Sequence, residues 1–266
     1  MRLLRKYFLI LLLAIFLLSL FPEVVTTAPY DLQFRDSANA SPSRVFPLGT
    51  DGVGRDRLAR LLYGTRLSLL LAPAAALLSV VLAAVIGAVA GFRGGWCDRI
   101  ATRVIDLTLS LPWLFLLITV RALLPLNVSP LTSVIITFTL LGFVGWASPA
   151  RVLRAGVRSL RQSDVVTQAK ACGCRNVRLL FVHLLPLLRP VLAAQFCTTV
   201  PVFILSEASL SLLGVGVAEP LPSWGNLLRE LESHASLNIG LLAPLILLVI
   251  VISCFQVVFS VEDVHS

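Results

Sequence analysis

Long apolar runs, separated by short polar segments, fill most of the chain. A run of about 20 apolar residues crosses a bilayer as one helix, and six runs of roughly this kind occur, at residues 7–21, 67–91, 104–120, 131–150, 190–213 and 239–260. The first run is short and follows Arg2, Arg5 and Lys6 as a secretory signal would, but the cleavage-site pattern after it is poor. We predict that this helix is retained and that the chain is an all-α polytopic membrane protein with about six transmembrane helices.

The composition excludes an ordinary soluble domain, because apolar residues make up 57% of the 266 positions and charged residues only 14%. We expect two parts. Residues 1–66 contain the first helix and an extracytoplasmic segment. Residues 67–266 contain the other five helices and a basic loop at about residues 151–189.

The positions of Lys and Arg predict the orientation, since short loops rich in these residues stay in the cytoplasm. The N-terminal cluster, the connection that carries Arg93, Arg99 and Arg103, and the loop 151–189 all fall on one side after six crossings. Both termini are then cytoplasmic. The net charge of +8 is a topology signal in this arrangement, and it argues against nucleic-acid binding.

The basic loop contains eight Lys or Arg residues and one acid, Asp164. We predict two short amphipathic helices joined at Gly173, with Ser163 or Asp164 as the N-cap of the first. The expected apolar face of the first helix is Val165, Ala169 and Cys172. That of the second helix is Val177, Leu180, Phe181 and Leu184. A membrane protein that presents such a hairpin offers it to a soluble partner, although an amphipathic loop with no binding role fits the pattern equally well.

Signals for catalysis, cofactors and metals are missing from the sequence. The two lysines, Lys6 and Lys170, do not stand in a phosphate-binding loop, and three histidines do not suffice for a multi-histidine metal site. Cys172 and Cys174 lack zinc-site spacing. We therefore predict no catalytic residue, no metal site and no cofactor.

Two acids lie in the apolar runs, and such acids mark function by default. We expect Asp106 to be paired or hydrated at the cytoplasmic interface, and Glu207 either to line a translocation path or to brace it by hydrogen bonds. Pro112 and Pro201 are expected to kink their helices, and Gly87, Gly91, Gly142 and Gly145 to permit close helix contacts. In the outer segment, Asp56 is placed to cap a short helix that ends at Gly64.

Three segments resemble one family. Thr167-Gln168-Ala169-Lys170-Ala171-Cys172-Gly173, followed by Leu184-Leu185-Pro186, resembles the EAA loop of ATP-binding-cassette (ABC) importer permeases. Residues 47–69 and residues 207–226 resemble the second, C-type permease subunit of the dipeptide, oligopeptide and nickel branch. The three segments occur in the family's order and spacing.

The resemblance implies a type I ABC-importer permease bundle with a cytoplasmic coupling hairpin, in a bacterial cytoplasmic (inner) membrane. The implied partners are a second permease subunit, two cytoplasmic ABC ATPases and an extracytoplasmic solute-binding protein, with the lipid bilayer around the helices. The residues that match the ATPase-coupling segment are Asp164, Val165, Thr167, Gln168, Ala169, Lys170, Cys172 and Gly173.

Peptides are the cargo that the resemblance implies first, with nickel chelates or glutathione as alternatives in the same family. A membrane enzyme and an autonomous channel are the competing classes. An intramembrane aspartyl protease needs two facing acids, however, and Asp106 and Glu207 stand at unlike depths in the predicted helices.

Overall fold

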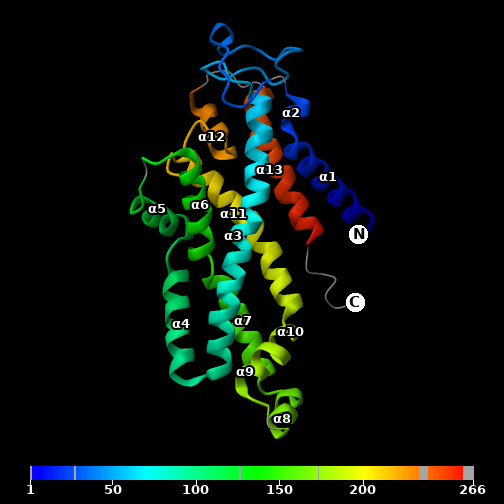
Figure 1. Ribbon diagram of the computed structural model, residues 1–266, viewed down its shortest axis with the longest axis vertical. Coiled ribbons are helices and arrows are strands. Elements are labelled where there is room, and N and C mark those ends of the chain that lie inside the picture. Colours follow the sequence, from blue (N-terminus) through cyan, green and yellow to red (C-terminus); the bar gives the residue numbers. More distant parts are fainter. Residues whose placement is uncertain (1, 27, 126, 173, 234–238, 260–266) are drawn as a thin grey trace.

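A computed structural model describes residues 2–26, 28–125, 127–172, 174–233 and 239–259. Within these ranges the regular structure is helical, apart from an isolated antiparallel bridge between Thr50 and Asp56. The molecule is elongated, with the outer segment at one end and α8 at the other (Figure 1). The observed architecture confirms the predicted all-α class.

The helices follow one another in a simple order along the chain. They are α1 Arg2–Leu20, α2 Pro22–Val25, η1 Arg35–Ser37, α3 Arg57–Arg93, α4 Gly95–Ser110, α5 Trp113–Ala122, α6 Pro130–Val144, α7 Ala147–Leu160, α8 Asp164–Ala171, α9 Asn176–Arg178, the π-helix η2 Leu179–Leu184, α10 Leu185–Leu187, α11 Arg189–Leu212, α12 Trp224–Arg229, η3 Glu230–Ser233 and α13 Ile239–Val258.

Five helical stretches are long and apolar enough to cross a membrane, and a sixth crossing is present if α4 and α5 are counted as one broken span. These two helices meet at an angle of 93°. Pro112 lies directly at the break, as the N-cap of α5. Proline cannot donate the backbone hydrogen bond that would continue α4 into α5. The predicted number of about six crossings is confirmed, and the predicted kink at Pro112 is a sharp bend.

Helix α3 is longer than the sequence pattern indicated. The carboxylate of Asp56 accepts a hydrogen bond from the Leu58 amide and caps the helix as predicted. The prediction that this helix is short and ends at Gly64 is wrong, because α3 continues for 37 residues to Arg93. Gly64 is tolerated inside the helix since it packs closely against the backbone of Pro222 and Ser223. Gly94, at φ +68°, ends the helix instead.

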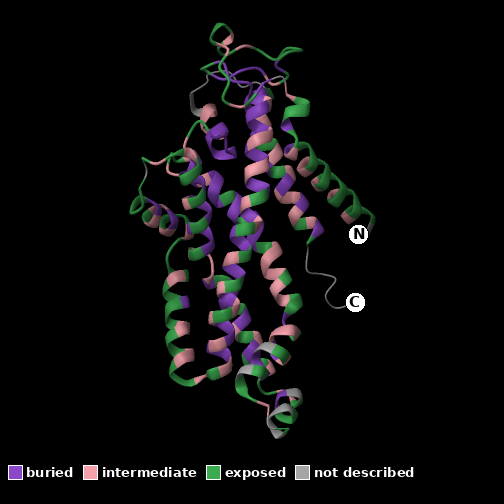
Figure 2. Ribbon diagram, viewed as in Figure 1, coloured by how far each residue is buried: buried purple, intermediate pink, exposed green. Residues whose placement is uncertain are grey.

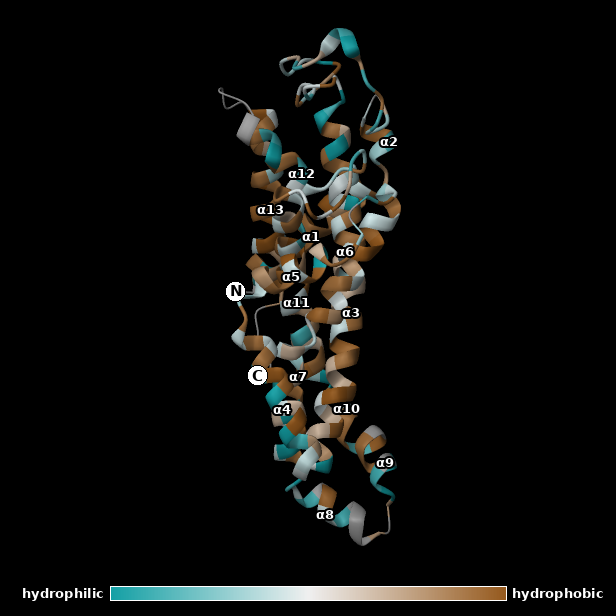
Figure 3. Cartoon of the chain, turned by 90° about the vertical axis from the view of Figure 1, so that its left-hand side faces the viewer, coloured by the Kyte–Doolittle hydropathy of each residue, from teal (hydrophilic) through white to brown (hydrophobic). Residues whose placement is uncertain are grey.

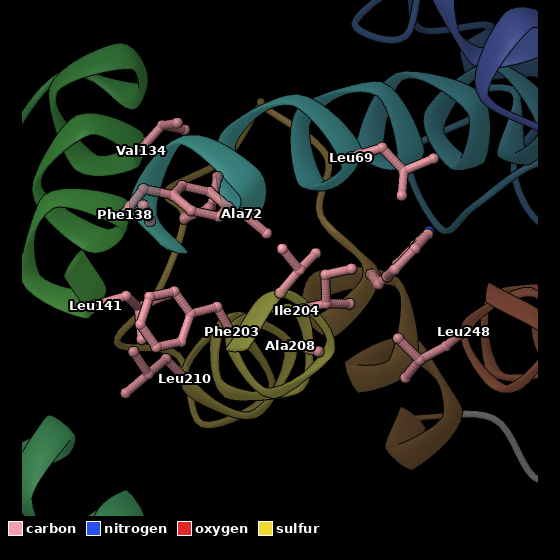
Figure 4. Close-up of a cluster of buried hydrophobic side chains, with 14 of the residues drawn as sticks. Leu69, Ala72, Val134, Phe138, Leu141, Phe203, Ile204, Ala208, Leu210 and Leu248 are labelled. Atoms are coloured by element: carbon pink, nitrogen blue, oxygen red, sulfur yellow. The ribbon is translucent and has the colours of Figure 1, made fainter. Parts of the chain in front are cut away.

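The main core lies where α3, α6, α11 and α13 meet. Figure 4 shows side chains from these helices pointing toward one another: Leu69 and Ala72 from α3, Val134, Phe138 and Leu141 from α6, Phe203, Ile204, Ala208 and Leu210 from α11, and Leu248 from α13. Gly142 allows this packing, because a Cβ atom there would lie 2.8 Å from Leu78 Cδ2. The prediction that Gly142 marks a close helix contact is confirmed.

Helix α1 leans on the outside of this core, against α13 and α3, and most of its side chains are exposed (Figure 2). The exposed residues are largely Leu, with Tyr7 and Ile10 among them. Apolar positions extend along the bundle, while hydrophilic positions gather toward its two ends (Figure 3). This distribution is that of a protein whose middle is solvated by lipid.

Candidate functional sites

The hairpin that follows α7 forms the end of the molecule opposite to the outer segment (Figure 1). Its first arm is α8, Asp164–Ala171, which agrees with the predicted helix. The carbonyl of Ser163 accepts hydrogen bonds from the amides of Val166 and Thr167. The Ser163 hydroxyl donates to the Leu160 carbonyl, so Ser163 starts the helix without a side-chain cap.

One side chain anchors α8 to the bundle. Val166 is only 1% exposed and packs in a cluster with Ala88 of α3, Val157 of α7, and Leu179 and Leu184 of the second arm. The predicted apolar face of Val165, Ala169 and Cys172 is wrong at Cys172, which is exposed. The short helix ends near this residue, so little of the molecule is available to cover it.

The other predicted coupling residues divide into two groups. Asp164, Thr167 and Gln168 are exposed together with Cys172, so a polar face of α8 is open to a partner. Gly173 and the side chains of Val165, Ala169 and Lys170 lie outside the described residues.

The second arm runs through α9, the π-helix η2 and α10 into α11. Leu180 and Leu184 are buried as predicted, and Leu179 is buried as well. The side chains of Val177 and Phe181 lie outside the described residues. A π-helix turns wider than an α-helix, so Leu179, Leu180 and Leu184 all reach the cluster that holds Val166.

Helix α7 connects the hairpin tightly to the inner halves of α3 and α4. A Cβ atom at Gly87 would lie 2.7 Å from the Ala150 carbonyl oxygen, and one at Gly91 would lie 2.6 Å from the Arg154 carbonyl oxygen. These contacts confirm the predicted role of both glycines. The guanidinium of Arg154 also forms a bidentate pair with Asp98 of α4, with Nη2 and Oδ2 2.8 Å apart.

Asp106 is paired with Arg151, and both side chains are more than half exposed. This pairing agrees with the prediction that Asp106 is neutralised or hydrated. The pair adds a second link between α4 and α7.

Glu207 is fully buried inside the chain, at 0% exposure. The Ser211 hydroxyl donates a hydrogen bond of 2.7 Å to its carboxylate and accepts one from the Val217 amide. Ser68 and Ser223 also face the carboxyl group. This environment favours the bracing alternative, because the carboxyl group is buried where α3, α11 and the segment before α12 meet, although its Oε2 accepts no hydrogen bond from the described residues.

A cavity of about 520 Å³ lies near the middle of the molecule, where the break between α4 and α5 faces the turn between α6 and α7 and one side of α11. Its polar side chains are Thr108, Ser148, Gln195, Thr198 and Thr199, and Glu207 is not among the lining residues. One local pattern marks these residues in the sequence, since uncharged polar residues occur near prolines inside three of the apolar runs.

An aromatic pair forms one wall of this cavity. The rings of Trp113 and Phe203 stack with centroids 6.3 Å apart and planes 6° apart. The indole N–H of Trp113 donates to the Ser206 hydroxyl at 2.7 Å, which fixes the orientation of the ring. Gly145 lies beneath Phe203, because a Cβ atom at this position would be 2.4 Å from Phe203 Cζ.

The outer end carries a buried ion-pair cluster that joins segments distant in sequence. Arg60, at 0% exposure, and Arg55 both bind the carboxylate of Asp51. Glu219 pairs with Arg55 at 3.1 Å, and Glu230 pairs with Arg57 at 3.2 Å. The cluster thereby brings together residues 47–69 and residues 207–226, two of the segments on which the family resemblance rests.

The electrostatics of the cluster favour a charged Asp51. Burial alone would raise the pKa of this carboxyl, but hydrogen bonds from Arg55 and the charges of Arg55 and Arg60 hold the pKa below its usual range. For Glu230, burial outweighs the attraction of Arg60 and Arg57 and raises the pKa. Asp51 is therefore the anion that holds the cluster together.

Comparison with known proteins finds relatives that are all permease components of transport systems. Residues 83–261 match the family model described as "Binding-protein-dependent transport system inner membrane component". The oligopeptide transport system permease protein OppC of Bacillus subtilis (strain 168) is 34% identical over 222 residues, which are 84% of this chain and 71% of the relative.

Two further relatives carry other names. The dipeptide transport system permease protein DppC of Bacillus subtilis (strain 168) is 32% identical over 217 residues, 82% of this chain and 66% of the relative. The glutathione transport system permease protein GsiD of Pectobacterium atrosepticum is 32% identical over 208 residues, 77% of this chain and 67% of the relative.

Proposed function

The chain belongs to the family of binding-protein-dependent transport system inner membrane components, and from this premise we propose how its parts move a solute. It is a multi-pass inner-membrane permease subunit of the peptide branch of ABC importers. As a transport subunit it supplies a path and a mechanical connection. ATP hydrolysis belongs to partner chains in this proposal.

The observation that carries the proposal is the exposed polar face of α8 on a helix anchored by one buried valine. Asp164, Thr167, Gln168 and Cys172 face outward, while Val166 holds the helix against α3 and α7. In our proposal an ABC ATPase receives this face in a groove, with Val165, Ala169, Lys170 and Gly173 completing the contact. A second ATPase docks in the same way on a second permease subunit.

Force applied to α8 has a short route into the bundle. Val166 transmits it to Val157 of α7 and Ala88 of α3, and the glycine contacts and the Arg154–Asp98 pair extend it to the backbone of α3 and to α4. The second arm transmits it separately to α11. Because these contacts are dense, we propose that the inner halves of α3, α4 and α7 rock as one body during alternating access.

The orientation in this proposal puts the hairpin, the N-terminus and the C-terminus in the cytoplasm. The outer segment, held by the Asp51–Arg60 cluster, then faces the extracytoplasmic solute-binding protein. The lipid bilayer surrounds the apolar middle, and nucleic acid has no part in the function.

We propose that Glu207 braces the bundle, and a direct role of this residue on the pathway stays a prediction. Uptake kinetics of Glu207→Gln test the pathway role. A pathway role requires altered uptake in a variant whose thermal stability matches the wild type, whereas a brace alone predicts that stability falls.

Peptides are the cargo that we propose, because oligopeptide and dipeptide permeases are among the relatives. Glutathione is itself a peptide and remains within this class. Nickel is the alternative within the family branch, and competition between a labelled peptide and nickel for uptake distinguishes the two.

The coupling role is tested by Gln168→Asp, which puts a charge on the exposed face of α8. We expect ATPase binding to weaken about tenfold or more, the usual effect of damaging an interface position. Gln33→Asp is the matched control, since Gln33 is also exposed but lies in the outer segment. Equal ATPase binding by both variants, measured by co-purification from membranes, contradicts the coupling assignment.

A further inference from the structure

Two backbone carbonyls make the central cavity more polar than its side chains alone indicate. Thr108 lies in the last turn of α4 and Gly145 is the C-cap of α6, and both residues line the cavity. The last four carbonyls of a helix have no donor within the helix. Inside a membrane-spanning bundle, such carbonyls need another donor, either water or a ligand.

Two side chains in the cavity also have unused hydrogen-bonding capacity. Within the described part of the chain, the Gln195 carboxamide and the Ser148 hydroxyl have no hydrogen-bond partner, and both residues are at least partly exposed. The hydroxyls of Thr108, Thr198 and Thr199 already donate to carbonyls of their own helices. Gln195 is therefore the one lining side chain, among the described residues, that offers both amide donors and an amide acceptor.

The cavity is uncharged as well as polar. None of the described residues that line it is Asp, Glu, Lys, Arg or His. An ion in such a site is left without an opposite charge, which is costly, whereas a neutral amide group finds donors and acceptors of its own kind. The stacked rings of Trp113 and Phe203 add an apolar wall beside these groups.

We infer that this cavity binds the peptide backbone of the cargo, with the Gln195 carboxamide paired to a cargo amide group and the Thr108 and Gly145 carbonyls accepting from cargo N–H groups. The inference rests on the proposed function, because it names the part of a peptide that this subunit contacts. A volume of about 520 Å³ is in the range of small-molecule sites. Because the cavity contacts backbone amides, it does not distinguish the side chains of the cargo. Peptides that differ in their side chains therefore make the same contact.

The test uses the complete transporter, with the second permease, both ATPases and the loaded binding protein, in proteoliposomes. Labelled trialanine is the probe at saturating binding protein. We expect Gln195→Leu to lower the maximal uptake rate about fivefold, as expected for the loss of one neutral hydrogen bond. Gln256→Leu is the matched control, because Gln256 is an exposed residue of α13 outside the cavity, and its uptake rate should equal that of the wild type.

A second experiment identifies the group of the cargo that Gln195 contacts. Each of the two peptide nitrogens of trialanine is methylated in turn, and the ratio of wild-type to Gln195→Leu uptake is measured for each analogue. Because the ratio compares two transporters with the same cargo, loss of affinity for the binding protein cancels. We expect a ratio of about five for trialanine and about one for one of the methylated analogues. The same ratio for all three cargoes overturns the inference.

Gln195→Glu covers the case in which the leucine variant fails to assemble, since it keeps the shape of the side chain. We expect it to make uptake depend on cargo charge, with Ala-Glu-Ala slower than Ala-Lys-Ala relative to the wild type. Equal relative rates overturn the inference while the proposed function stands. A wild-type transporter that takes up nickel and no peptide overturns the proposed function together with the inference.

Discussion

Two aspartate–arginine pairs in this molecule have the same chemistry and opposite surroundings. The Asp51–Arg60 pair is buried, with side chains 2% and 0% exposed, whereas the Asp106–Arg151 side chains are 56% and 53% exposed. Removing one partner from a buried pair leaves an ion without water or counter-charge, and removing one from an exposed pair does not. The two aspartates should therefore differ widely in importance for stability.

Asp51→Asn is expected to lower the free energy of unfolding by about 3 kcal/mol, because Arg60 and Arg55 lose their shared carboxylate. Asp106→Asn is the control and should cost less than about 1 kcal/mol. Thermal unfolding of both variants in detergent measures the difference. Similar losses in the two variants would mean that the outer cluster does not hold the segment in place.

The same carboxyl predicts a pH dependence. Its pKa lies below the ordinary value of 3.8, so its contribution to stability is complete above that value and is lost as the pH falls below it. Hydrogen exchange in the outer segment should therefore show undiminished protection by this pair between pH 7 and about pH 5. Loss of protection near pH 6 that Asp51→Asn abolishes would contradict the lowered pKa.

Gly87→Ala tests the contact between α3 and α7. The added Cβ atom would lie 2.7 Å from the Ala150 carbonyl oxygen, and backbone cannot move aside as a flexible side chain can. We expect a loss of about 1–3 kcal/mol in unfolding free energy, the usual cost of overpacking. Gly64→Ala is the control in the same helix, because its nearest neighbour lies at 3.4 Å, and its melting temperature should stay within a few degrees of the wild type.

At the scale of helices, the apolar pattern located the crossings but did not show where they are interrupted or extended. Pro112 lies at the break between α4 and α5, whereas Pro73, Pro201 and Pro244 lie inside continuous helices, so a proline alone does not show which crossing is broken. Gly64 misled the prediction for α3, because a glycine in a helical pattern is typical of a helix end, whereas this backbone stays helical to Arg93. The burial of Val166 in α8 was not predicted, since in so short a helix several faces can carry an anchor.

Val166→Asp is expected to release α8 from the bundle, because the charge would replace the one buried side chain among those that the structure describes in this helix. Hydrogen exchange over residues 164–171 should become about tenfold faster or more, corresponding to the loss of one buried valine. Val182→Asp is the matched control, as Val182 of η2 is 54% exposed. Unchanged protection of α8 in Val166→Asp would show that other contacts hold the helix.

At the scale of the whole molecule, the sequence predicted the hairpin better than the sites that depend on the fold. The hairpin is local, so the sequence pattern predicted the bounds of α8 and the burial of Leu180 and Leu184. The outer cluster joins Asp51 to Glu219 and Glu230, and the cavity joins residues from three crossings. Because no local pattern sets which helices are neighbours, the sequence could not place Gln195 beside Ser148, and it left open whether Glu207 faces a path or a core.

The orientation of the whole chain gives one more prediction. Cys172 is exposed on the hairpin, and Ser41 is exposed in the outer segment. With the other free cysteines replaced by serine, a membrane-impermeant maleimide should label Cys172 in inside-out vesicles only. A Ser41→Cys variant that also lacks Cys172 should be labelled in right-side-out vesicles only, because the two sites lie at opposite ends of the bundle (Figure 1). Labelling of Cys172 from the outer side would refute the proposed topology.

The unbroken length of α3 has a geometric consequence. Its 37 residues make a rod of about 55 Å, held near one end by arginine–carboxylate pairs and near the other by the close contacts of Gly87 and Gly91 with α7. If the rod pivots near its centre by roughly 10°, each tip swings by about 5 Å, and the two tips swing in opposite directions. In the proposed alternating access, a pivot of this kind would open one membrane face while it closes the other.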